Sequence, residues 1–227
     1  ATIIFHNPAM LNFVADKTIN LNYMTYMEGS KTASASFVKA AMERATWGVS
    51  AQYMNYGTMR EFDESNVETG DFSAKDIAIA GSFAYMLSQK ISGGVSMRFI
   101  SSTIGSYNSM AVGVDLGVNY YDSEREWSLS AVARNLGGQV KAYDDNFEHI
   151  PFDLQVGVSK KLKGAPFRLS ATMSRLHRWD VGLFKHLCLG ADVLLGSNVY
   201  VAAGYNFRRA NEMKIEDNDS KSSHGAG

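Results

Sequence analysis

Several residue types and patterns that would define a function are scarce in this 227-residue chain. Cys188 is the only cysteine, which excludes an internal disulfide and a cysteine-based zinc cluster. The formal net charge is -1, so nucleic-acid binding driven by basic charge has no support. No apolar run approaches the ~18 residues that a membrane-spanning helix needs, which excludes a helical membrane protein.

Glycine and aromatic residues, in contrast, are plentiful. The chain has 20 glycines against three prolines, and 11% of its residues are aromatic. This composition favours many strands that are joined by tight turns. The length suits one large domain or one barrel.

The clearest periodic pattern is the run SMAVGVDLGVNYY at residues 109–121. Every second residue from Met110 to Tyr120 is apolar, whereas the residues between them are small or polar. Because successive side chains of a strand point to opposite faces, this run predicts a strand with one apolar face. Its length and its two terminal tyrosines are typical of a strand that crosses a bilayer.

The same alternation recurs ten more times along the chain, so we predict about eleven strands and no helix. The other runs cover residues 18–27, 33–37, 45–53, 77–85, 91–99, 127–134, 153–159, 167–174, 186–193 and 199–208. Charged residues inside these strands fall on the polar face, as Arg98, Asp115, Arg134, Arg168 and Asp192 do. A charge that faces lipid near mid-depth costs roughly 2–4 kcal/mol, so the polar face is predicted to line a lumen. There, Asp115 is expected to pair with Arg98 or Arg134.

The lengths of the connections alternate as well. Short turns are predicted at residues 42–44, 88–90, 121–126, 162–166 and 196–198. Longer loops are predicted at residues 57–74, 101–108, 137–151, 177–185 and after residue 209, with one short exception at residues 28–31. In a meander each class of connection lies at one end of the strands, which is the outer-membrane arrangement of periplasmic turns and extracellular loops. This sorting and the strand number argue against a soluble sandwich or a lipocalin-type barrel.

The ionisable residues do not form a catalytic pattern, so the sequence predicts no catalytic, cofactor or metal site. His186, Cys188 and Asp192 share one strand face, where a polar lumen stripe is favoured over a metal site. Acidic clusters at residues 61–71 and 144–148 offer oxygen ligands that suit calcium, but they lack glycine-punctuated ligand spacing, which favours solvated loops. Arg208, Arg209 and Lys214 suit either lipopolysaccharide phosphates or interface anchoring, with anchoring favoured.

Seven longer motifs resemble the PorQ family of the type IX secretion system of Bacteroidota. They are HNPAML (6–11), NYGTMREFDE (55–64), GDFSAKD (70–76), SSTIGSYNSMAVGVDLGVNYY (101–121), NLGGQVKAYD (135–144), IPFDLQVGVSKKLKGAPFRLS (150–170) and GYNFRR (204–209). They follow one another in order along nearly the whole chain.

The resemblance implies an all-β, antiparallel outer-membrane β-barrel of the fatty-acid-transporter type, with 14 strands in the full protein. Residues 1–17 are expected to form a periplasmic or lumen-facing segment, and residues 18–227 the barrel, truncated at both ends. The implied partners are a PorZ-like surface protein, a PorV-like barrel and a PorU-like sortase, in a complex that attaches secreted cargo to lipopolysaccharide.

The predicted function is therefore a non-enzymatic outer-membrane anchor for a surface complex. Residues 57–74 and 137–151 are the predicted contact surfaces, because loops on a rigid scaffold commonly carry function. The alternative is a channel for hydrophobic small molecules, which the barrel relatives make plausible. The serine, glycine, asparagine and charged residues of the lumen face lean against an apolar tunnel.

Overall fold

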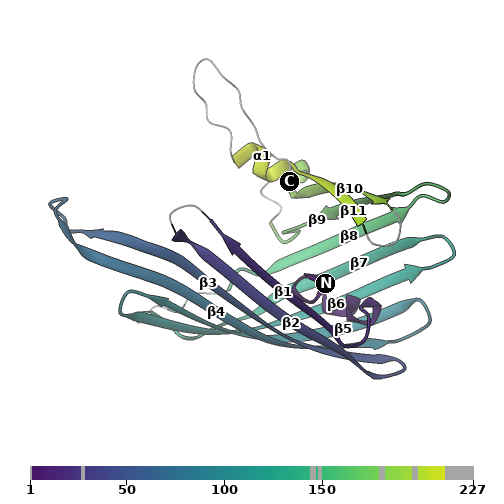
Figure 1. The fold of residues 1–227 in the computed structure, drawn as a ribbon, viewed down its shortest axis with the longest axis horizontal. Coiled ribbons are helices and arrows are strands. Elements are labelled where there is room, and N and C mark those ends of the chain that lie inside the picture. The colour runs from purple at the N-terminus through teal and green to yellow at the C-terminus, as the bar shows by residue number, and fades with distance from the viewer. Residues whose placement is uncertain are drawn as a thin grey trace, which may run out of the picture.

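The computed structural model describes residues 2–26, 29–143, 147, 150–178, 182–195 and 199–212 of the chain. Within them, eleven strands form one antiparallel sheet in sequence order from β1 to β11 (Figure 1). The strands are β1 (Thr18–Thr25), β2 (Lys31–Met42), β3 (Ala45–Phe62), β4 (Glu68–Met86), β5 (Ile91–Ile104), β6 (Tyr107–Asp122), β7 (Trp127–Lys141), β8 (Asp153–Lys161), β9 (Phe167–Met173), β10 (Leu187–Leu195) and β11 (Val199–Asn206). The predicted all-β meander and its strand number are confirmed.

Short helices also occur, although none was predicted. They are the 3-10 helices η1 (Thr2–Phe5), η2 (Pro8–Phe13) and η4 (Leu183–His186), and the α-helix α1 (Phe207–Glu212). Among the described residues, no helix is both long and apolar enough to cross a membrane.

The polarity of the sheet is inverted relative to that of a soluble protein. On β6, Asp115 and Asn119 are buried, whereas their neighbours Leu116, Val118 and Tyr120 are exposed. The other strands repeat this pattern, with buried serines at Ser36, Ser50, Ser82, Ser92 and Ser96 and exposed apolar side chains between them. A soluble sheet buries its apolar face instead, so this arrangement places the apolar face toward lipid and the polar face toward a lumen.

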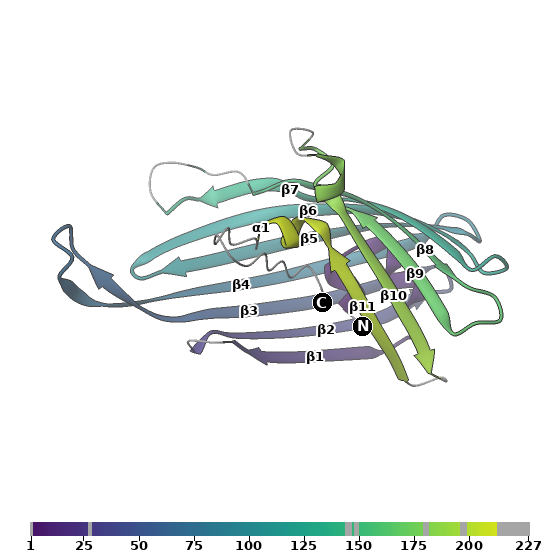
Figure 2. The same ribbon diagram turned by 90° about the horizontal axis from the view of Figure 1, so that it is seen from above.

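The hairpin of β3 and β4 projects beyond its neighbours (Figures 1 and 2). These strands have 18 and 19 residues, and their pairing continues from Thr58 and Ser73 to Phe62 and Glu68. The pairing of β3 with β2 stops at Asn55, and that of β4 with β5 stops at Ala74. Residues 58–73 therefore form a two-stranded ribbon, which we call the β3–β4 ribbon.

The ribbon corrects the prediction that residues 57–74 are a loop. Only residues 63–67 lie outside the strands, and Asp63 closes this turn by accepting hydrogen bonds from the backbone N–H groups of Ser65 and Val67, both at 2.9 Å. The sequence pattern failed because both faces of the ribbon lie in water, so no apolar alternation marks its strands.

Two other predicted loops are partly strand, because residues 101–104 and 137–141 carry no apolar alternation that would mark them. The predicted loop 101–108 is mostly strand, since β5 ends at Ile104 and β6 begins at Tyr107. Strand β7 continues to Lys141 within the predicted loop 137–151. Strand β11 ends at Asn206, because its Oδ1 accepts hydrogen bonds from the backbone N–H groups of Arg208 (3.0 Å) and Arg209 (3.1 Å) and begins α1.

Candidate functional site in the lumen

The N-terminal segment, residues 2–14, lies against the polar face of the sheet (Figure 1). Helix η2 contacts β3, β4, β5 and β6, and η1 contacts β3. Pro8, Ala9 and Leu11 are fully buried there, as is Asn7. The Asn7 side chain caps η2 by accepting a hydrogen bond from the Ala9 N–H at 3.0 Å, and Pro8 suits the first helical position because it has no N–H to satisfy.

The seat of this segment is a row of residues without bulky side chains. Ala84 of β4 pairs with Gly94 of β5, which pairs with Gly117 of β6. A Cβ atom at Gly94 would collide with the backbone of Pro8 and Ala9, and one at Gly117 would collide with Oδ1 of Asn7. The glycines are therefore required for the close approach of the N-terminal segment to the sheet.

Polar and apolar contacts tie the ends of the segment to the sheet. The Asn12 side chain donates to Oγ of Ser92 at 2.7 Å, and Arg134 donates to the Phe5 carbonyl at 3.0 Å. The rings of Phe13 and Tyr121 meet edge to face at 5.5 Å. A small apolar cluster lies inside the polar face and comprises Ile4, Leu11, Val38 and Ala84, with Phe5 and Val14 packed against it.

A charged network lies beside the segment and is built around Asp115. Arg98 donates to Oδ2 of Asp115 at 2.8 Å, and the backbone N–H of Asn135 donates to Oδ1, also at 2.8 Å. Asn135 has a φ of +59°, and the register of β6 and β7 shifts between Val114 and Leu116, so Asp115 faces a β-bulge. Of the two predicted pairings of Asp115, the structure shows the one with Arg98.

His6 projects from the N-terminal segment close to this network. Desolvation by the surrounding barrel lowers the pKa of its imidazole, and the positive charges of Arg134 and Arg98 lower it further. The neutral form of His6 is therefore favoured at neutral pH, which avoids a third positive charge beside the two arginines.

A second lumen charge pair lies on β9 and β10. Nε of Arg168 donates to Oδ2 of Asp192 at 2.8 Å. Asp192 is one of the three residues that were weighed as a metal site with His186 and Cys188, and its carboxylate pairs with Arg168 instead. Nδ1 of His186 contacts the Ser174 carbonyl at 2.8 Å. In the part of the chain that the structure describes, no group of three or more His, Cys, Asp or Glu side chains could hold a metal ion.

The remaining predicted sites lie in the ribbon, in α1 or outside the described residues. In the ribbon, Glu68 pairs with Arg60 at 3.6 Å on the surface. Arg208 and Arg209 lie in α1 rather than at the top of a strand. The residues Asp144, Asp145, Glu148 and Lys214 lie outside the described part of the chain.

The sequence did not predict the contacts of the N-terminal segment. The only signal was the coincidence of Asn7-Pro8-Ala9 near the start with isolated glycines on the polar face of two strands. An isolated glycine in a strand indicates close approach of another backbone, but it does not say which one.

An antiparallel meander with an apolar exposed face, a polar buried face and a segment seated inside it is the architecture of an outer-membrane β-barrel. Its lumen face presents a wall of buried hydrogen-bonding side chains, such as Ser82, Ser96 and Asn119.

Comparison with solved structures gives the same fold. The chain is similar to the crystal structure of the Pseudomonas putida toluene transporter TodX, with a TM-score of 0.62 and 12% identity over 90% of this chain and 78% of that one. It is also similar to a TodX deltaS2S3 mutant, described as a monoaromatic hydrocarbon channel, with a TM-score of 0.62 and 13% identity over 90% and 77% of the chains. No protein-family model and no curated protein matches the sequence.

The predicted fold class is thus shown: the chain has the fold of an outer-membrane β-barrel of the kind found in hydrocarbon transporters. The two neighbours are described as a transporter and a channel. At this level of identity the likeness concerns the fold alone.

Proposed function

We propose that this barrel is a PorQ-like outer-membrane component of the type IX secretion system, and that it anchors a surface complex that attaches secreted cargo to lipopolysaccharide. The sequence resemblance along nearly the whole chain supports this proposal. The observation in the structure that carries it is the β3–β4 ribbon, which extends beyond the wall of the barrel.

The ribbon is longer than membrane crossing requires and has the character of an interaction surface. A tilted strand crosses a bilayer with about 9–11 residues, whereas β3 and β4 have 18 and 19. Residues 58–73 include five acidic residues and one arginine, and Met59, Phe62 and Val67 expose apolar side chains between them. An isolated two-stranded hairpin is marginally stable in water, so a partner would stabilise this one.

The proposed orientation places the ribbon outside the cell. The ribbon lies at the same end of the sheet as the two longest connections, from β7 to β8 and from β9 to β10, and the turns at 43–44, 87–90, 123–126 and 162–166 lie at the other end. Short turns face the periplasm in barrels of this class. The PorZ-like protein is the proposed direct partner, with the PorV-like barrel and the PorU-like sortase in the same complex.

Shortening the ribbon tests this proposal. We expect that replacing residues 59–72 by Asn-Gly, which favours a two-residue hairpin turn, leaves the barrel inserted but abolishes recovery of the PorZ-like partner. The measurement is affinity purification from solubilised outer membrane, with heat-modifiable migration as the test of folding. As the matched control, replacing Lys163–Ala165 in the β8–β9 turn by Asn-Gly should leave recovery unchanged. Undiminished recovery with the shortened ribbon would contradict the assignment.

A second candidate function is passage of hydrophobic small molecules, and the structural comparisons support it more than they support a secretion role. The neighbours are described as a toluene transporter and a monoaromatic hydrocarbon channel. The polar lumen wall and the N-terminal segment seated on it argue against an apolar conduit. Toluene flux into liposomes that contain the purified barrel, above that of protein-free liposomes and without any protein partner in the purification, would favour this second function.

A further inference from the structure

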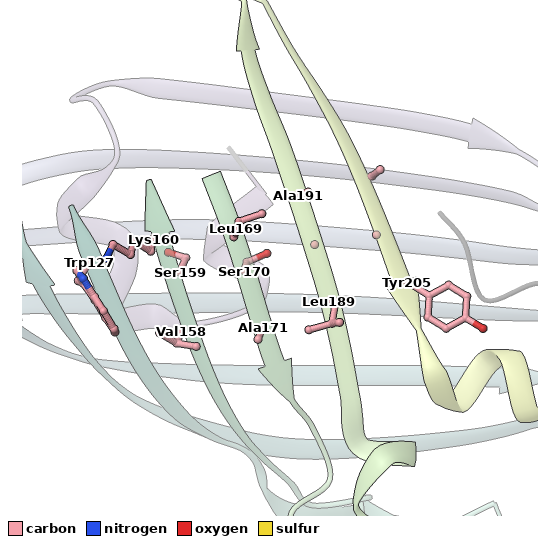
Figure 3. A pocket seen from close by; sticks show the side chains of 13 residues that line it. Trp127, Val158, Ser159, Lys160, Leu169, Ser170, Ala171, Leu189, Ala191 and Tyr205 are labelled. Carbon is pink, nitrogen blue, oxygen red and sulfur yellow. The ribbon is translucent and has the colours of Figure 1, made fainter. Parts of the chain in front are cut away.

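The outer face of the barrel has a groove of about 650 Å³ across β7–β11 (Figure 3). Two rows of cross-strand partners form it. One row is Trp127, Lys160, Leu169, Ala191 and Ala203, and the other is Val158, Ala171, Leu189 and Tyr205. Both rows lie on the exposed apolar face of the sheet, opposite the Arg168–Asp192 pair of the lumen.

The groove exists because large and small side chains are distributed unevenly along these rows. Ala171, Ala191 and Ala203 form its floor, together with the backbone at Gly190 and Gly204. Bulky side chains stand at its two ends, with Trp127 at one end and Tyr205 at the other. Its volume falls in the range of about 300–1,000 Å³ that is typical of small-molecule sites.

A positive charge marks one end of this otherwise apolar groove. Nζ of Lys160 lies 5.0 Å from the ring centroid of Trp127, and both residues are at the strand ends that adjoin the short turns. Arg125 and Lys163 lie in those turns. Tryptophan and lysine at this level are typical of the boundary between acyl chains and headgroups.

We propose that this groove binds one glycerophospholipid, with an acyl chain on the alanine floor and the lipid phosphate beside Lys160. The choice of occupant follows from the combination of an apolar groove that faces the bilayer with a cation at the depth of the headgroups. The lysine ammonium attracts a phosphate as a point charge. The small side chains of the floor let a hydrocarbon chain lie flat against the backbone. The site is independent of the proposed secretion function.

The barrel provides matched controls for both parts of the site. Lys39 of β2 is directly opposite Trp47 of β3, as Lys160 is opposite Trp127, and Lys39 is likewise exposed. Ala51 of β3 is an exposed alanine in the same outward series as Val49 and Tyr53. Neither control residue lines the groove.

The test is native mass spectrometry of the purified barrel titrated with dioleoyl phosphatidylglycerol. We expect one saturable lipid per wild-type barrel, loss of that lipid in Ala191→Trp, and its retention in Ala51→Trp. Lys160→Gln should weaken binding about fivefold, whereas Lys39→Gln should not, since one interfacial cation contributes a factor of this size. Dioleoylglycerol, which lacks the phosphate, should bind as weakly to wild type as to Lys160→Gln.

Four outcomes would overturn the proposal. They are unsaturable lipid adducts of equal strength in all variants, equal loss in the groove and control variants, preferential retention of lipopolysaccharide, and a dimer of the barrel that Ala191→Trp dissociates. The first would indicate bulk lipid only, and the last would assign the groove to a second copy of the chain. Ala191 faces lipid, so a larger side chain there should not prevent folding. Heat-modifiable migration verifies the folding of each variant.

Discussion

Gly94→Val is expected to expel the N-terminal segment from its seat. A Cβ atom at this position would lie 2.7 Å from Cα of Ala9 and closer still to neighbouring backbone atoms, which cannot rotate away as a flexible side chain could. Overpacking of a close contact costs roughly 1–3 kcal/mol, and loss of the buried cluster around Leu11 adds to this cost. Limited proteolysis should therefore cleave within residues 2–14 of the variant but not of the wild type.

The matched control is Gly81→Val. Gly81 of β4 has no atom within 4 Å of a built Cβ, so the added side chain meets open space. Single-channel conductance gives a second measurement, because a displaced segment should enlarge the path through the lumen. Protection of residues 2–14 in Gly94→Val equal to that in Gly81→Val would contradict the description of the seat.

Asp115→Asn is expected to destabilise the barrel by roughly 3–5 kcal/mol, because the change leaves Arg98 buried without its counter-charge. The two side chains are 5% and 16% exposed, and the carboxylate also accepts the N–H of the bulged residue Asn135. The free energy of unfolding in urea measures this effect.

Two further variants separate the lost ion pair from the change of side chain. Asp192→Asn removes a pair that has the same 2.8 Å separation but is 22% and 44% exposed, so its expected cost is below about 1 kcal/mol. Arg98→Met combined with Asp115→Asn should recover part of the loss, since no unpaired charge remains. Equal costs for Asp115→Asn and Asp192→Asn would show that burial does not decide the strength of these pairs.

The sequence predicted those parts of the fold that depend on the two-residue period of a strand. Leu116, Val118 and Tyr120 alternate with Asp115 and Asn119, and one face of lipid-exposed residues follows directly from that alternation. The charged residues confirm this assignment of the two faces independently, because Arg98 and Asp115 fall on the same face and pair across neighbouring strands. Strand number needed no further information, but the predicted loop lengths did, because residues 57–62, 68–74 and 101–104 are strand.

Features that depend on pairing outside the bilayer could not be predicted in this way. Arg60 and Asp71 are paired positions of the ribbon, yet charged residues on both faces indicate a loop when read by period alone. The seat of the N-terminal segment was missed for a different reason. Its fit depends on Asn7, Gly94 and Gly117, which are far apart in the sequence and carry no shared periodic signal.

The central claim is that the exposed apolar face of the sheet contacts lipid and the polar face lines the lumen. Site-directed spin labelling tests it most directly, with Cys188→Ser as the background and single cysteines at Met97 and Phe99 on the apolar face and at Ser82 and Ser96 on the polar face. In reconstituted bilayers, labels at Met97 and Phe99 should collide readily with oxygen dissolved in the lipid, whereas labels at Ser82 and Ser96 should not. High oxygen accessibility at Ser82 and Ser96 with low accessibility at Met97 and Phe99, or equal values at all four, would contradict the account.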